Sequence, residues 1–235
     1  MKPIRYLFPV SKLALICLAL AGCAQVDSSK VAPSEVYTSY SASYSEDNGR
    51  VSVNAYFTVG KGFGTQVALD GGSTVNVNGS QMREQSDLFG GVYYEYARAI
   101  STNNDLLNPF IIRYSDNNGR TYTNAARIPS RVMASANSYR GGDLVIPWNS
   151  YDNLGVNENI SAKLEAGGKT IYASDHYGGN HGLLIFSASD MATINDSSAT
   201  VTVCRKSSSD AVDAPSVGGY MNLSYCASTM RISLR

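Results

Sequence analysis

The chain has 235 residues, and its 19 basic and 19 acidic side chains give a formal net charge of zero at pH 7. A chain without a basic excess does not attract nucleic acid or anionic membrane surfaces by long-range charge, so no nucleic-acid partner is expected. Beyond the N-terminal region, no apolar stretch approaches the 18 residues that mark a membrane-spanning helix.

Residues 1–22 are organised like an export signal. Lys2, Arg5 and Lys12 are basic, and no acidic residue accompanies them. Residues 13–21 then form an apolar run of nine residues. Such a run is too short to span a bilayer but suits the apolar region of a signal peptide. An ordinary cleaved signal with an incidental cysteine after it is the alternative interpretation.

The tetrad Leu20-Ala21-Gly22-Cys23 resembles the lipobox of bacterial lipoproteins at each of its four positions. The resemblance implies a thioether-linked diacylglycerol on Cys23, cleavage before Cys23, and an N-acyl chain on the new amine. Two or three acyl chains hold a protein stably on a membrane, so the membrane is an expected partner and no other cofactor is expected. Ala24 stands where Asp would retain an enterobacterial lipoprotein in the inner membrane, which implies the outer membrane, on its periplasmic side or at the cell surface.

Removal of residues 1–22 would leave 213 residues with 16 basic and 19 acidic side chains. This length suits two sandwich domains of roughly 100 residues each. Residues 23–33 comprise the lipidated N-terminus and a small, polar segment without periodicity. Such a segment predicts a flexible tether between the lipid and the folded protein.

From residue 34 the hydrophobic period is two, and no convincing helical period follows. Apolar and polar residues alternate over residues 40–44 and 51–59, which predicts two half-buried strands. Asn48-Gly49 between them tolerates the positive φ that a hairpin turn needs.

Similar hairpins are expected around residues 70–73 and 116–119. The result is seven strands within about 95 residues, a count typical of an immunoglobulin-like sandwich. We therefore predict an all-β chain of two tandem immunoglobulin-like antiparallel β-sandwiches, at residues 34–130 and 131–235. The one helical turn that we expect is at residues 187–191.

Two of the four cysteines are candidates for a disulfide. Cys17 leaves with the signal and Cys23 is lipidated, so Cys204 and Cys226 pair by default in the oxidising cell envelope. Side-chain alternation places both on the polar face of their strands, which favours a cross-strand bridge. Free thiols or half of a metal site are the alternatives. In an uninterrupted strand, the apolar residues near the C-terminus would point to the same polar face as Cys226. A bulge or break is therefore expected at residues 227–229.

A wider resemblance extends over most of the mature chain. Its pieces are TQVALDGGSTVNVNG (65–79), DLVIPW (143–148), VTVCR (201–205) and Gly218-Gly219. With the lipobox, these pieces resemble a group of uncharacterised proteobacterial lipoproteins. The resemblance implies two β-sandwich domains and supplies no activity.

His176 and His181 are the only histidines, and Asp175 precedes them in a glycine-rich segment. Two imidazoles and a carboxylate could gather a transition metal and support a metal-dependent hydrolase. A spacing of five residues without a third firm ligand is not a recognised zinc pattern. An exposed polar loop is therefore the preferred interpretation.

Other catalytic patterns are missing from the sequence. It has no Gly-x-Ser-x-Gly elbow and no Walker or dinucleotide loop, and its Asp/Asn-Gly turns lack the alternating acids of a calcium loop. We therefore expect that the protein is not an enzyme.

The chain contains 16 tyrosines. Tyr93, Tyr94 and Tyr96, with those of residues 37–44, could form an exposed aromatic surface for a glycan or a protein. Tyrosine is also an ordinary strand residue, and this second interpretation is favoured. The expected function is a non-catalytic interaction or structural module, with an envelope protein or glycan as its partner. A carbohydrate-binding module that uses exposed tyrosines is the alternative.

Overall fold

The computed structural model describes residues 25–61, 64–88, 90–101, 104–136, 139, 141–176 and 178–234. The predicted signal peptide and Cys23 lie outside these residues. Within them the structure is mostly β, which confirms the predicted class, and no helix is long and apolar enough to cross a membrane.

In the described residues, the strands form three sheets. The largest has the order β1 (Gln25–Asp27), β4 (Thr65–Ala68), β3 (Arg50–Val59), β2 (Val36–Ser45), β17 (Gly219–Cys226), β16 (Ser198–Asp210), β13 (Glu158–Ala166) and β14 (Lys169–Asp175). Beside this path, β7 (Arg83–Ser86) pairs with β8 (Val92–Ala99), β8 with β3, and β18 (Met230–Ser233) with β16.

Two smaller sheets complete the structure. One contains β10 (Thr121–Ala126), β9 (Phe110–Ser115), β5 (Thr74–Val77) and β6 (Ser80–Gln81), and the other β11 (Val132–Ala134), β12 (Leu144–Ser150) and β15 (His181–Phe186). The helical segments are short: η3 (Ser28–Lys30), η4 (Pro33–Glu35), α1 (Asn104–Leu107) and α2 (Ala188–Met191).

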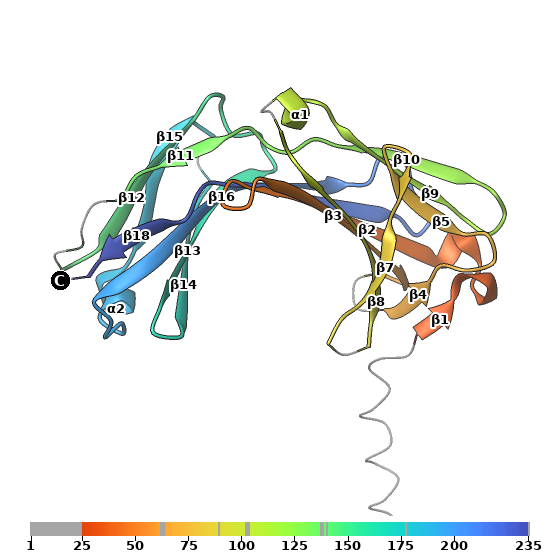
Figure 1. Cartoon of the computed structure of the whole chain (residues 1–235), viewed down its shortest axis with the longest axis horizontal. Coiled ribbons are helices and arrows are strands. Elements are labelled where there is room, and N and C mark those ends of the chain that lie inside the picture. Colours follow the sequence, from red (N-terminus) through yellow and green to blue (C-terminus); the bar gives the residue numbers. More distant parts are fainter. Residues whose placement is uncertain are drawn as a thin grey trace, which may run out of the picture.

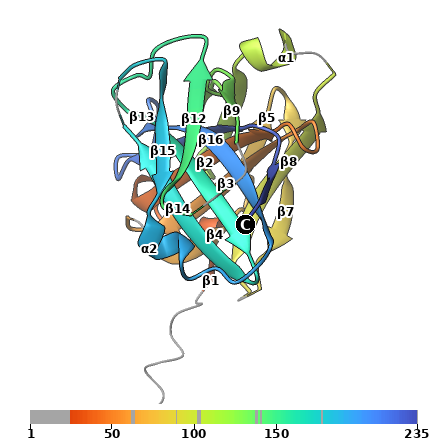
Figure 2. The ribbon, with the colours of Figure 1, turned by 90° about the vertical axis from the view of Figure 1, so that its left-hand side faces the viewer.

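The large sheet forms an arch (Figure 1). The sheet of β10, β9, β5 and β6 covers the outer side of the right-hand half, and the sheet of β11, β12 and β15 lies over the left-hand half. Figure 2, seen from the left-hand end, shows β12, β14 and β15 at that end with β2 and β3 beyond them. Each half of the arch is therefore a sandwich in which one layer belongs to the shared sheet.

The core lies between the shared sheet and the two covering sheets. Burial alternates along β2 and β3, as the period of two predicts. Phe57 of β3 lies at the centre of an aromatic cluster, with its ring centroid 4.7 Å from that of Tyr114 and 5.7 Å from that of Tyr94. Full burial of such a ring contributes roughly 1.5–3 kcal/mol.

One parallel strand pair joins the two halves. β17 pairs with β2 over eight residues, from Gly219 opposite Thr38 to Cys226 opposite Ser45. β16 bridges the halves, since its first part pairs with β13 and β18 and its last part with β17. The predicted boundary at residues 130/131 is thus crossed by a hydrogen-bonded sheet, and it stays a prediction about which parts fold on their own.

We expected residues 23–33 to form a flexible tether, but from Gln25 on this segment is part of the fold. β1 pairs in parallel with β4, with Gln25 opposite Gln66. Ser28 is buried, and its hydroxyl accepts a hydrogen bond from the backbone N–H of Asp70 at 2.9 Å. The Asp70 carboxylate accepts from the backbone N–H and the hydroxyl of Ser29, both at 2.7 Å. Polar contacts and strand pairing hold this segment, together with the partly buried side chains of Val26 and Val31, and such contacts give no hydrophobic periodicity.

Two local predictions are confirmed, and a third is wrong. Residues 70–73 connect β4 to β5, which lie in different sheets and do not pair, so they form no hairpin. Gly49 in the turn between β2 and β3 has φ 60°, and Gly119 in the turn between β9 and β10 has φ 81°, values that suit glycine because it lacks a Cβ. The predicted helical turn is α2, where the hydroxyl of Ser187 accepts from the backbone N–H of Asp190 at 3.1 Å. This bond is an ordinary N-terminal cap.

We predict that the two halves unfold together, because separating them would expose the paired edges of β2 and β17. Differential scanning calorimetry of the full chain in detergent should show one transition, with equal calorimetric and van't Hoff enthalpies. Two resolved transitions would contradict the shared sheet and favour two independent domains.

Candidate functional site

The predicted lipidation site, Cys23, lies outside the described residues. The nearest described residue is Gln25, the first residue of β1. Only Ala24 stands between Cys23 and this strand in the sequence. The structure therefore places the start of the fold directly after the predicted anchor.

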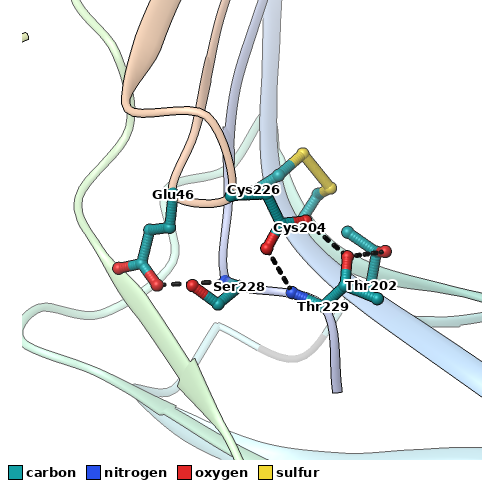
Figure 3. Close-up of a disulfide and its surroundings, with 7 residues drawn as sticks. Glu46, Thr202, Cys204, Cys226, Ser228 and Thr229 are labelled. Atoms are coloured by element: carbon teal, nitrogen blue, oxygen red, sulfur yellow. Dashed lines mark hydrogen bonds between the residues drawn. A yellow bond between two sulfur atoms is a disulfide. The ribbon is translucent and has the colours of Figure 1, made fainter. Parts of the chain in front are cut away.

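The disulfide between Cys204 and Cys226 is present, which confirms the prediction (Figure 3). The two residues are opposite each other in the antiparallel pair of β16 and β17, with their Cα atoms 4.1 Å apart. Both alternate with core residues and lie on the polar face, as predicted. The expected break also occurs, since β17 ends at Cys226 and β18 begins at Met230.

The turn between β2 and β3 holds this break in place. The carboxylate of Glu46 accepts from the backbone N–H of Ser228 at 3.0 Å and from Nε of Arg131 at 2.7 Å, and it also accepts from the Tyr225 hydroxyl. Asp47 next to it accepts from the backbone N–H of Thr229 at 2.8 Å. Figure 3 shows Glu46, Ser228 and Thr229 beside the disulfide.

These contacts change the acidity of both carboxyl groups. Burial opposes the ionisation of Glu46, but hydrogen bonds from Tyr225, Ser228 and Arg131 outweigh it and lower the pKa of Glu46. The hydroxyl and backbone N–H of Thr229 lower the pKa of Asp47. Sequence reasoning explained Glu46 and Asp47 as turn residues alone, because their partners are about 180 residues away in the chain and no local pattern connects them.

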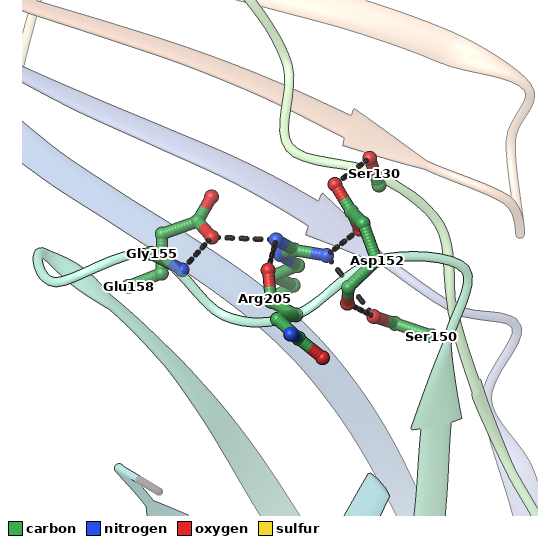
Figure 4. Close-up of polar contacts among 7 residues, drawn as sticks. Ser130, Ser150, Asp152, Gly155, Glu158 and Arg205 are labelled. Atoms are coloured by element: carbon green, nitrogen blue, oxygen red, sulfur yellow. Dashed lines mark hydrogen bonds and ion pairs between the residues drawn. The ribbon is translucent and has the colours of Figure 1, made fainter. Parts of the chain in front are cut away.

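A second group of charges surrounds Arg205, whose side chain is 2% exposed (Figure 4). Its two terminal nitrogens contact carboxylate oxygens of Asp152 and Glu158, both at 2.5 Å. It also donates to the hydroxyl of Ser150 and the carbonyl oxygen of Asn153, both at 3.1 Å. Sequence reasoning missed this cluster, because a charged residue in an alternating strand gives no sign of the face that it occupies.

The Arg205 cluster is suited to structure rather than to catalysis. Burial of Asp152 opposes its ionisation, but Arg205 and Ser130 outweigh this effect and lower the pKa of Asp152. The guanidinium is thus paired with both carboxylates. Removing one carboxylate would leave the buried guanidinium of Arg205 with one charged partner fewer, which destabilises the fold.

The structure does not gather the predicted metal residues. Asp175 is buried and accepts a hydrogen bond from Nε1 of Trp148 at 3.0 Å. His176 and His181 are exposed, and Nδ1 of His181 lies 3.0 Å from the side-chain oxygen of Asn180. Among the described residues, no group of three or more His, Cys, Asp and Glu side chains is close enough to hold a metal ion.

The three predicted binding tyrosines lie in different environments. Tyr94 is buried, and its hydroxyl accepts from the backbone N–H of Leu69 at 2.6 Å. Tyr96 is half-buried and packs against the core. Tyr93 lies on the polar face, where its ring stacks on Tyr56 with the centroids 5.5 Å apart and the planes at 21°. Tyr56 is 38% exposed.

A pocket of 730 Å³ opens on the polar face of the half of the arch that contains β2, β3 and β8. We use "polar face" for the side of β7, β8, β3, β2 and β17 that points away from the core. The pocket is lined mainly by polar residues of five strands, β2, β3, β6, β7 and β8, and of the turn between β2 and β3. The lining residues are Ser43, Ser45, Asn48, Arg50, Val51, Ser52, Ser80, Gln81, Arg83, Gln85, Glu95, Tyr96 and Ala97. No sequence signal identified it, because its residues come together only through strand pairing.

Comparison with known proteins gives no family. No family model and no curated protein matches the chain. Among solved structures, the chain is similar to one titled "Cytokine receptor complex - Crystal form 1A", at 10% identity and a TM-score of 0.26, over 83% of this chain and 95% of that one.

We predict that replacing both Cys204 and Cys226 with Ser lowers the free energy of unfolding by about 3 kcal/mol, since the bridge closes a loop of 22 residues. Urea unfolding at pH 7 in an oxidising buffer measures the difference. A reductant should lower the wild type to the level of the variant and leave the variant unchanged. Equal midpoints for the two oxidised proteins would contradict the stabilising role.

We also predict that stability falls in acid. Because folding lowers the pKa of Glu46, its contribution is complete above the unfolded value of about 4.3 and is lost as the pH falls through the folded value. Glu46→Gln should therefore be less stable at pH 7 and lose less stability between pH 5 and 3. Exposed Glu35→Gln is the matched control for removing one carboxylate. Parallel pH profiles for the wild type and Glu46→Gln would refute this assignment.

Proposed function

We propose that this chain is a lipid-anchored protein of the bacterial cell envelope that serves as a non-catalytic interaction or structural module. The observation that carries the proposal is the complete lipobox, Leu20-Ala21-Gly22-Cys23, after a basic and then apolar segment. Cys23 would carry a diacylglycerol and an N-acyl chain. Ala24 supports the outer membrane as the location.

The architecture is consistent with such a module. We interpret the arch as two immunoglobulin-like sandwiches, residues 34–130 and 131–235, that share one sheet. A sandwich is a rigid scaffold whose loops and outer faces are free to carry binding residues. The buried charge of Arg205 serves this scaffold, since it pairs with the carboxylates of Asp152 and Glu158.

The position of β1 supports work close to the bilayer. Two Cα–Cα steps separate Cys23 from Gln25, so their Cα atoms are at most about 7.6 Å apart. β1 lies at the lower right in Figure 1, on the side towards which the arch opens. A lipid on Cys23 would therefore hold the concave, polar side of the shared sheet towards the membrane surface.

A carbohydrate-binding module is the second candidate. It is favoured by the stacked pair of Tyr56 and Tyr93 on the polar face, beside a pocket lined with hydroxyl and amide groups. Aromatic rings present flat apolar surfaces, and hydroxyl groups both donate and accept hydrogen bonds. Sugars offer complementary surfaces of both kinds.

We predict that Cys23→Ser abolishes covalent lipidation in a bacterial host and removes the protein from the outer-membrane fraction. Incorporation of labelled palmitate and membrane fractionation measure the two effects. Cys17→Ser is the matched control, because this cysteine lies in the predicted signal, and it should keep both label and location. A wild type without label, or a labelled Cys23→Ser variant, would overturn the proposed anchor.

A further inference from the structure

The pocket on the polar face is built from neighbouring strands whose registers place its residues in rows. Ser43 of β2 is opposite Ser52 of β3, and Ser52 is opposite Ala97 of β8. Two residues further along β2, Ser45 is opposite Arg50 of β3. The backbones of β2, β3 and β8 are paired with one another at these positions, so side chains supply the recognition in this wall of the pocket.

The second wall of the pocket comes from β6 and β7. Arg83 of β7 is opposite Glu95 of β8, and Gln85 is opposite Tyr93. Gln81 of β6 stands two residues before Arg83, so both belong to the same alternating set of side chains, and both line the pocket. The volume of 730 Å³ lies within the range of about 300–1,000 Å³ that is usual for small-molecule sites.

Two arginines give the pocket an excess of positive charge. Arg50 and Arg83 are exposed, and within the described part of the chain neither guanidinium forms an ion pair or a side-chain hydrogen bond. The pocket has one carboxylate, that of Glu95, which lies 3.5 Å from the hydroxyl of Ser52. Two positive groups and one negative group leave a net charge of +1.

These groups define the chemistry of a ligand. Guanidinium groups bind carboxylates and phosphates through paired hydrogen bonds in one plane. Serine, asparagine and glutamine side chains recognise groups that both donate and accept, as sugar hydroxyls do. Because the apolar lining is small, the pocket does not fit an apolar molecule.

We propose that this pocket binds an anionic saccharide, whose carboxylate or phosphate is held by Arg50 and Arg83 and whose hydroxyls contact the serine and amide side chains. The inference rests on the second candidate function, carbohydrate binding, and it does not depend on the lipid at Cys23. The stacked rings of Tyr56 and Tyr93 adjoin Gln85 and Glu95 in the register, so a second sugar unit can extend over them.

Isothermal titration calorimetry of the full chain in detergent tests the proposal. The probes are trigalacturonate, glucose 6-phosphate, the neutral trisaccharide maltotriose and hexaglutamate peptide. We expect saturable binding of trigalacturonate or glucose 6-phosphate that is at least tenfold tighter than binding of maltotriose. The anionic saccharide that binds more tightly shows whether the pocket prefers a carboxylate or a phosphate.

Variants connect binding to the pocket. Arg50→Gln with Arg83→Gln should weaken binding at least tenfold, and Ser43→Phe, which fills the pocket and removes no charge, should do the same. Arg113→Gln is the matched control, because Arg113 is an exposed arginine on β9 in the covering sheet, and it should bind like the wild type.

Three outcomes would overturn the proposal: no saturable binding of either anionic saccharide, binding that the pocket variants leave unchanged, or binding of hexaglutamate in preference to both saccharides. The Cys23→Ser experiment measures membrane attachment alone. Failure of one test therefore leaves the result of the other intact.

Discussion

The parallel pairing of β2 with β17 is the interaction on which the rest of the structure depends. It brings together a strand near the start of the fold and one near its end, and it merges what would otherwise be two sheets into one. Parallel neighbours require a long connection, and here that connection contains most of both sandwiches. The polar face is continuous across the junction because the alternation of β2 continues in β17 and β16.

Two kinds of contact fasten this junction. The disulfide links β16 to β17 at the point where β16 passes from one half to the other, and Glu46 and Asp47 bind the chain directly after Cys226. Hydrogen bonds to charged groups contribute about 1.5–3 kcal/mol each, more than neutral ones. The covalent and charged contacts therefore hold one short segment, residues 226–229, against the turn of β2 and β3. The pocket opens beside this turn, so its walls depend on the same contacts.

Sequence patterns predicted what short-range chemistry determines. Alternation predicted the longer strands, and the Asn-Gly pairs at residues 48–49 and 118–119 predicted two hairpin turns. The glycine-rich turn at residues 70–73 was wrongly expected to be a hairpin, because turn residues do not show whether the flanking strands pair. Side-chain alternation predicted that Cys204 and Cys226 share the polar face. Long-range pairing could not be predicted, because no pattern in β2 or β17 indicates a partner strand about 180 residues away. The docking of residues 25–35 was missed since Ser28 and Ser29 bind Asp70 through polar groups. Arg205 and the pocket arginines look alike in sequence, yet one is buried and paired and the others are exposed.

Native-state hydrogen exchange of β2 and β17 tests the shared sheet most directly. Amides that close the pairing between residues 38–45 and 219–226 should exchange only through global unfolding, with the same free energy as the most protected amides of β13 and β16. Exchange from β17 at a much lower free energy, while β2 and β13 stay protected, would show that the halves separate before either unfolds, and it would contradict this account.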